Sequence, residues 1–507
     1  MRLSACLLPS LAPVLVGSAA ALLCAACASA PPRTVRGAPS TSAAAGQSWT
    51  PAPRAAAPLT DAERALGARG GAALGITADV ATRMHRLTLT DVADIALGNS
   101  PATRLSWAQA RAAAARVGAA NGQFLPTVFA EVNGGPARAI SANPARLPAD
   151  RRTLVPSITL QYLLFDFGAR NGTSRAAREA LYAADFTHNA AVQTVLLQSQ
   201  QAYFAYQAAR GVLDATRANV STARQNVAAA DRRHEVGLAT IADVLQAQTA
   251  LAQAELAAQG ADGDLQAARA TLAFTMGMQP TRSFDVATDT AAFPLRELAE
   301  SVDTLIAHAE RDRPDLAAAR ALVRQSDAQI SVARSATLPQ LTLGSTAGRN
   351  FANVSTLEGR TYALTLGLQI PIFSGNARQY DVVAARETAA ASVANAEQAR
   401  LMAAAQVFTS YHTLRTAAQR VTTSQTLLGT ATQSEEVARG RYAEGVGNIL
   451  DVLLAQNALA DARAQAVTAR WTWFSALSQL ARDAGAIAPG GAAGLRFSSD
   501  STGGLPR

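Results

Sequence analysis

Two hydrophobic patterns alternate along this chain, one with helical spacing and one with strict alternation. From Leu87 onward the chain consists of long alanine-rich stretches, and proline is absent from 157–279 and from 372–488. Because proline interrupts the interior of a helix, these stretches permit unusually long helices. The sequence predicts helices of 67 residues over 170–236 and 378–444, each about 100 Å long at 1.5 Å per residue.

A glycine turn is predicted after each long helix, followed by a shorter return helix. Apolar residues recur there with the alternating three- and four-residue step of a coiled-coil seam. The predicted seam residues are Leu238, Ile241, Leu245, Gln248 and Ala252 in the first return helix and Val446, Ile449, Leu453, Gln456 and Ala460 in the second. Short helices at about 88–122 and 240–276 together match the first long helix in length. Each half is therefore predicted to form a thin layer of helices about 100 Å long.

Strict alternation of apolar and polar residues predicts strands at 158–164 and 362–370, with partner strands at about 127–133 and 340–346. Four such strands could form a half-buried soluble sheet, but they are too few to make a soluble sheet domain beside helices of this length. Strands that cross a bilayer are the favoured interpretation. The side chains expected to face lipid are Tyr362, Leu364, Leu366, Leu368 and Ile370. Four strands cannot close a barrel, so the chain is expected to assemble from several copies.

The chain contains an internal duplication. Pro101 and Pro314 each stand 25 residues before a second proline, and further along the two halves align at a constant offset of 208 residues. The clearest match pairs 241–248 with 449–456, where Asp and Gln stay in register, and Gly237 and Gly445 precede the two segments in register. We assign 87–285 to a first repeat, 286–487 to a second, and 488–507 to a disordered C-terminal tail.

The N-terminus reads as a targeting segment. Residues 1–27 have the charged start, apolar core and small residues of a secretory signal peptide, and 28–86 reads as a flexible tether. Cys27 follows a run of small residues and is predicted to be lipidated, while ordinary cleavage after Ala28 or Ala30 is the alternative.

Composition excludes several classes of function. All 45 basic residues are arginines and are scattered despite a formal charge of +8, which argues against nucleic-acid binding. The five histidines show no metal-ligand spacing, and a phosphate-binding loop with lysine is impossible because the chain has no lysine. Asp166 and Asp381, near strand ends, are interpreted as solvated loop acids. We predict no cofactor, no metal and no enzymatic activity.

The sequence resembles the TolC family of outer-membrane channels. The resemblance runs from about Leu87 to Ala484 and rests on four segments in order. They are Leu87-Thr88-Leu89…Ala96-Leu97…Asn99-Ser100-Pro101, Phe165-Asp166-Phe167-Gly168…Arg170, Pro371-Ile372-Phe373-Ser374-Gly375…Arg378, and Arg441-Tyr442…Gly445…Leu450-Asp451-Val452-Leu453…Ala455-Gln456…Leu459.

The resemblance implies a mainly α fold with membrane β structure. Three copies would form a twelve-stranded barrel in the outer membrane and a twelve-helix tunnel through the periplasm of a Gram-negative bacterium. It implies contact with outer-membrane lipid, with a periplasmic adaptor and with an inner-membrane pump of the RND or ABC type.

The resemblance also implies where a periplasmic gate and an adaptor contact would lie. Leu450 and Asp451 fall on gate positions and Asp243 on the equivalent position of the first repeat. For both acids the alternative role is a carboxylate that stabilises a helix N-terminus. Leu454 stands where many members of the family have an acid, so a leucine ring with a single acidic ring is expected. The adaptor-contact tip comprises Val236, Gly237, Leu238 and Gly445.

Three functions remain in competition. The first is a passive outer-membrane conduit for efflux of small molecules. The second is the channel of a type I protein-secretion system, which a weak likeness of Ser106-Trp107-Ala108-Gln109 to toxin-secretion channels favours. The third is a periplasmic structural coiled-coil protein, against which the alternating strands argue.

Overall fold

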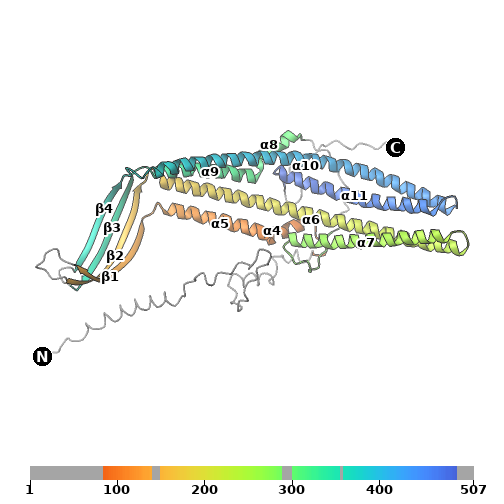
Figure 1. The fold of residues 1–507 in the computed structure, drawn as a ribbon, viewed down its shortest axis with the longest axis horizontal. Coiled ribbons are helices and arrows are strands. Elements are labelled where there is room, and N and C mark those ends of the chain that lie inside the picture. Colours follow the sequence, from red (N-terminus) through yellow and green to blue (C-terminus); the bar gives the residue numbers. More distant parts are fainter. Residues whose placement is uncertain (1–83, 140–148, 288–299, 354–357, 488–507) are drawn as a thin grey trace, which may run out of the picture. The chain divides into compact units, whose positions relative to one another are not determined.

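The structure, a computed structural model, describes residues 84–139, 149–287, 300–353 and 358–487 (Figure 1). In the first half the described elements are α4 (Leu89–Asn99), α5 (Pro101–Gly122), β1 (Thr127–Ala139), β2 (Ala149–Phe165), α6 (Ala169–Glu235) and α7 (Ile241–Thr275). In the second half they are α8 (Val302–Asp312), α9 (Pro314–Ser335), β3 (Gln340–Ala352), β4 (Gly359–Gln369), α10 (Ala377–Ala443) and α11 (Ile449–Asp483).

The two halves repeat one order of elements. Matching helices have equal lengths of 11, 22, 67 and 35 residues. The two 67-residue helices begin and end one residue earlier than predicted, so the expected long helices are confirmed. The halves differ in the sheet, where β2 has 17 residues and β4 has 11. The signal peptide, the C-terminal tail and the tether up to residue 83 lie outside the described residues.

The four described strands form one antiparallel sheet in the order β1-β2-β3-β4 (Figure 1). The β2–β3 pairing joins the two halves, with Thr153 opposite Ala352 and Phe165 opposite Leu341. All four strands exist as predicted, but β1 and β3 continue about six residues further than expected, and β2 begins nine residues earlier. The predicted strands stopped short of two prolines that the paired strands contain, Pro136 opposite Arg152 and Pro156 opposite Val132.

The prediction of one helix over 88–122 is wrong, because the helix breaks between α4 and α5. Ser100 has the extended dihedrals φ −59° and ψ 126°, and its hydroxyl accepts a hydrogen bond from the Ala102 N–H at 3.2 Å. Pro101 disfavours a helical conformation in the residue before it, so Ser100 ends one helix and caps the next.

The long helices pack against most of the others. In the described part of the chain, α6 contacts α4, α5, α7, α9 and α11, and α10 contacts α8, α9 and α11. The main core lies about midway along the long helices, where Leu305, Val407 and Leu480 have no exposed surface. No helix among the described residues combines the length and apolar character needed to cross a membrane.

The predicted coiled-coil seam is right for part of the second repeat and wrong in the first. Ile449, Leu453 and Gln456 are buried and Ala460 is half-buried, but Val446 is 69% exposed. Leu238, Ile241 and Leu245 are instead more than half exposed. The α6–α7 seam uses small residues, which let the two helices approach closely; its members are Val220, Ala223, Ala230, Val244, Ala247 and Ala254.

Candidate gate at the helix turns

The α6–α7 turn depends on a left-handed glycine. Gly237 has φ +77°, and its N–H donates to the His234 carbonyl at 2.9 Å. The Leu238 N–H donates to the Arg233 carbonyl at 2.7 Å, which closes the helix end in a Schellman-type arrangement. Val236 and Leu238 on either side are 68% and 70% exposed, so the predicted adaptor-contact residues lie at the surface of this tip.

The α10–α11 turn has the same backbone design. Gly445 has φ +76°, and the Val446 N–H donates to the Arg441 carbonyl at 3.0 Å. Asn448 then caps α11 by accepting a hydrogen bond from the Leu450 N–H at 3.0 Å. The duplication therefore extends to the conformation of the two tips.

The two candidate gate acids differ in their surroundings. Asp243 belongs to a capping box: its carboxylate accepts from the Thr240 N–H at 2.8 Å, and its own N–H donates to the Thr240 hydroxyl at 3.3 Å. Asp451 is exposed, and the cap of its helix is made by Asn448 instead. The role of a carboxylate that caps a helix N-terminus therefore fits Asp243. The Asp451 carboxylate does not cap its helix and is accessible to solvent and ions.

Leu450 and Asp451 lie on the exposed side of α11. Leu450 is 44% exposed and Leu454, four residues on, is 59% exposed. The intervening Val452 and Leu453 are buried. Residues four apart share a helix face, so this exposed strip carries two leucines beside one acid.

Two contacts tie the α6–α7 hairpin to the α10–α11 hairpin near the tips. The Arg233 guanidinium donates to the Tyr442 carbonyl at 3.1 Å and lies 4.6 Å from the centre of the Tyr442 ring. Asn226 donates to Gln456, which in turn donates to the buried Glu435 at 3.3 Å. The sequence reasoning missed both contacts, because the offset of 208 shows which positions of the repeats are equivalent and not which residues touch.

The interpretation of Asp166 as a solvated acid is wrong. Asp166 is 4% exposed and accepts hydrogen bonds from the backbone N–H groups of Arg170 at 2.8 Å and Gly168 at 3.1 Å, and from the Arg170 Nε at 3.1 Å. Burial favours the protonated carboxyl, but these hydrogen bonds and the guanidinium charge outweigh it and lower the pKa of Asp166 below its ordinary value. This network fixes the junction between β2 and α6. Asp381 is exposed, but it lies within α10 rather than in a loop.

The predicted lipid-facing row is exposed in the single chain. Tyr362, Leu364, Leu366 and Leu368 on β4 are 63–90% exposed, and Ile370 just beyond it is 56% exposed. Cys27 lies outside the described residues. Within the described ranges no three histidine, cysteine or acidic side chains gather as metal ligands would.

Solved structures with this fold are outer-membrane channels. The CmeC outer membrane channel of Campylobacter jejuni superposes with a TM-score of 0.71 and 20% identity, covering 78% of this chain and 85% of that chain. With four antiparallel strands on long paired helices, the fold is that of an outer-membrane channel with a periplasmic extension.

Sequence comparison identifies the family. The family model described as "Outer membrane efflux protein" matches residues 92–278 and 305–486, one segment in each half. Protein CyaE of Bordetella pertussis is 33% identical over 387 residues, covering 76% of this chain and 81% of that protein. Outer membrane protein OprJ of Pseudomonas aeruginosa is 27% identical over 419 residues, covering 80% of this chain and 85% of that protein.

The chain therefore belongs to the outer membrane efflux protein family, the TolC family recognised from its motifs. It is a channel and not an enzyme. Members of the family form trimers with adaptor and pump partners.

Proposed function

We propose that this chain is the passive outer-membrane conduit of a tripartite system that exports small molecules. Three copies would join a periplasmic adaptor and an inner-membrane pump of the RND or ABC type. The family's description as efflux proteins supports small molecules as cargo. The β4 row from Tyr362 to Ile370 would then face outer-membrane lipid, where its apolar side chains are stable.

The gate of this conduit is proposed at Leu450 and Asp451. The observation that carries the proposal is the difference between the two acids, since the Asp243 carboxylate caps its helix and the Asp451 carboxylate does not. If the α10–α11 tips converge on the threefold axis, Leu450 forms an apolar ring that excludes water and Asp451 an acidic ring that selects cations. The Arg233–Tyr442 contact would hold the closed arrangement.

Planar-bilayer recordings test this gate. Leu450→Ala with Asp451→Ala should raise single-channel conductance, because it removes both the apolar and the charged ring. Asp451→Ala alone should weaken block by multivalent cations. Asp243→Ala is the matched control: it should leave the conductance unchanged and lower stability by about 1 kcal/mol through loss of the capping box. Unchanged conductance in the assembled double variant would show that the constriction lies elsewhere.

Type I protein secretion remains the alternative cargo class, because the same conduit can serve both. Complementation of a bacterium without its own channel distinguishes the two. Restored resistance to small toxic compounds, without secretion of a type I protein substrate, would support efflux. The reverse result would assign the channel to protein secretion.

A further inference from the structure

All arginines of the described strands gather at one end of the sheet. The strands β1 to β4 contain five of them: Arg138, Arg151, Arg152, Arg349 and Arg360. Each lies among the last four residues at the ends that connect β1 to β2 and β3 to β4. None lies at the ends where the strands adjoin the helices. The sheet therefore carries its positive charge at the end away from the helices.

The sheet has one apolar face, and four of these arginines continue it. Successive side chains along a strand alternate between its two faces. Arg360 stands two residues before Tyr362, so it lies on the face of the exposed apolar row that runs to Ile370. The register gives the other residues of this face near the same end; they are Arg138, Asp150, Arg152, Leu154, Arg349 and Phe351. Among the five arginines, Arg151 alone lies on the opposite face.

The arginines of the apolar face exceed the acids beside them. Arg138 lies 3.8 Å from Asp150, and both side chains are more than 70% exposed. The other three have no described acid within ion-pair distance, and we call them the rim arginines: Arg152, Arg349 and Arg360. All three are exposed. Even with Glu358, which is exposed just before β4, four arginines stand beside two acids.

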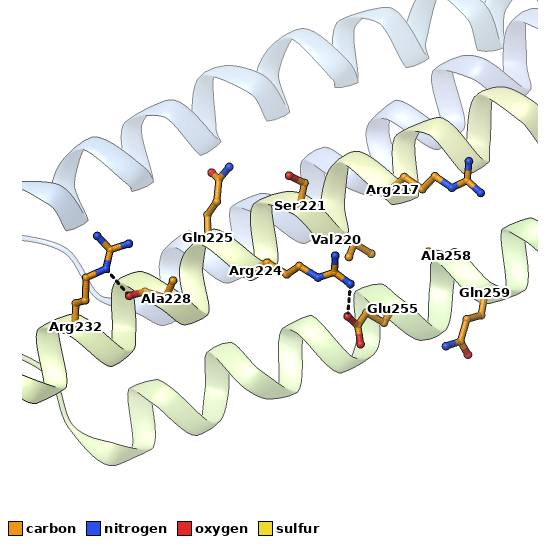
Figure 2. A pocket seen from close by; sticks show the side chains of 10 residues that line it. All are labelled: Arg217, Val220, Ser221, Arg224, Gln225, Ala228, Arg232, Glu255, Ala258 and Gln259. Atoms are coloured by element: carbon orange, nitrogen blue, oxygen red, sulfur yellow. Dashed lines mark hydrogen bonds and ion pairs between the residues drawn. The ribbon is translucent and has the colours of Figure 1, made fainter.

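Arginines of the helices show a different arrangement. On α6, Arg224 pairs with Glu255 of α7 at 2.9 Å (Figure 2). On the sheet, Arg349 lies directly opposite Arg360. Like charges at directly opposed positions destabilise a pair of strands. An anion bound to both guanidinium groups would remove this repulsion.

The place of the rim arginines along the strands corresponds to the surface of a bilayer. The apolar row from Tyr362 to Ile370 covers nine residues, and a tilted strand needs about 9–11 residues to cross the bilayer core. Aromatic residues border the apolar band of a membrane barrel. Tyr362 and Phe351 have this position, and the Arg349 guanidinium lies 4.8 Å from the centre of the Phe351 ring. Outward-facing arginines are costly at the bilayer midplane but not at its surface.

We propose that the rim arginines bind the phosphate groups of the phosphorylated glycolipid in the outer leaflet of the outer membrane. The proposal rests on the proposed function, in which the apolar face of the sheet lies against lipid. Guanidinium groups bind phosphate oxygens through paired N–H donors. Their fixed charge also attracts anionic headgroups to the membrane surface.

The spacing of the rim arginines favours a headgroup with two phosphates. Leu154 lies opposite Phe351, so Arg152 stands four residues farther from the helices than Arg349 does. Four residues of a strand span about 13 Å. A glycolipid with phosphates on two sugars can contact both levels of charge, whereas a phospholipid with a single phosphate contacts one.

A second copy of the chain does not supply the missing negative charge. The segments 140–148 and 354–357, which connect the strands at this end, contain no acidic residue. The acid of β1 is Glu131, and it lies on the opposite face of the sheet. A neighbouring β1 would instead add another Arg138. Lipid phosphate therefore fits this surface better than a subunit contact does.

Native mass spectrometry of the full-length protein in detergent, with added lipid, tests the proposal. The probes are lipid A with two phosphates, its fully dephosphorylated form, and phosphatidylglycerol. We expect lipid A with two phosphates to bind more tightly than the other two. The variant R152Q/R349Q/R360Q should weaken its binding about 10-fold, and R360Q alone about 3-fold, since each exposed charge pair contributes modestly. The control R386Q/R415Q/R420Q, which removes three exposed arginines of α10, should bind lipid A as the unmodified chain does.

Four results would overturn the proposal. Equal binding of lipid A and its dephosphorylated form would show that phosphates are not recognised. Equal binding of phosphatidylglycerol would contradict a headgroup with two phosphates. Equal weakening by the control variant would show a general attraction to positive charge. Loss of trimer assembly in the triple variant, with unchanged lipid binding by R360Q, would assign the rim arginines to a contact between subunits.

Bilayer conductance of the same proteins separates this proposal from the proposed function. A triple variant that conducts and still binds lipid A as the unmodified chain does would contradict the lipid site alone. An unmodified chain that binds lipid A but fails to conduct would contradict the proposed function.

Discussion

Gly237 and Gly445 hold the two tips in a conformation that other residues adopt only at a cost. Both have φ near +77°, and no atom lies within 4 Å of the place where a Cβ would stand. A side chain would therefore meet no steric obstacle, and the cost of replacing either glycine is a cost of backbone conformation alone.

Gly237→Ala should lower the stability of the protein by about 1–2 kcal/mol, because alanine disfavours the left-handed region. Gly260→Ala is the matched control: Gly260 lies inside α7 with open space around it, so alanine should stabilise that helix by about 0.5–1 kcal/mol. Thermal unfolding followed by circular dichroism measures both. Equal effects at the two positions would contradict the conformational account.

At the scale of single residues, the sequence identified the tips but not the ion pairs. Gly237 and Gly445 follow long helical patterns, so their turns were predictable from local chain alone. The prediction for Asp166 was wrong because the burial of this side chain depends on how the junction between β2 and α6 folds. Arg170, one helical turn later, supplies the positive charge that pairs with the Asp166 carboxylate. The Arg233–Tyr442 contact joins residues 209 apart, and no local pattern encodes such a distance.

At the scale of elements, the stability contributed by the β2–α6 junction should decrease at low pH. The pKa of Asp166 is lower in the folded chain than in the unfolded chain. The ionised carboxylate therefore contributes fully to the free energy of unfolding above about pH 4, and this contribution is lost as the pH falls through the pKa of the folded chain. Asp166→Asn should cost about 1–3 kcal/mol at neutral pH and should flatten the loss of stability below pH 4. Apparent melting temperatures between pH 7 and pH 3 measure this effect. Asp381→Asn, at an exposed position on α10, is the control and should leave the pH profile as it was.

Helices and strands were predictable where a local sequence pattern alone determines the structure. Freedom from proline, together with the glycine turns at Gly237 and Gly445, predicted both 67-residue helices to within one residue. The α6–α7 seam was missed because the heptad rule favours bulky leucines, whereas these helices approach closely on Val244 and Ala247. The extra length of β1 and β2 was missed because Pro136 and Pro156 interrupt the local pattern, whereas the two strands stay paired through both prolines.

At the scale of the whole molecule, β1 and β4 are the two edges of the described sheet, each with an unpaired side. Open edges are not stable inside a bilayer, so we expect neighbouring copies to pair β4 with β1. Native mass spectrometry of detergent-purified protein should show a trimer. A stable, fully helical monomer would overturn the assembly.

The N-terminus is expected to anchor the trimer. The small residues before Cys27 favour its acylation, and Ala28, in place of an aspartate that could retain the protein in the inner membrane, favours the outer membrane. Mass spectrometry of the mature protein should find a chain that begins at an acylated Cys27. An unmodified N-terminus at Ser29 or Pro31 would contradict the predicted lipid anchor but not the assignment as a channel.

The β2–β3 pairing has a consequence for the order of folding. Thr153 pairs with Ala352, so about 200 residues must be synthesised and exported before β2 finds its second neighbour. The β1–β2 hairpin can close locally, but until then β2 presents an open edge to the periplasm. Contacts so distant in sequence form slowly. In refolding experiments, helical circular dichroism should therefore appear before the sheet closes, and export of the first half alone should leave a species that aggregates through β2.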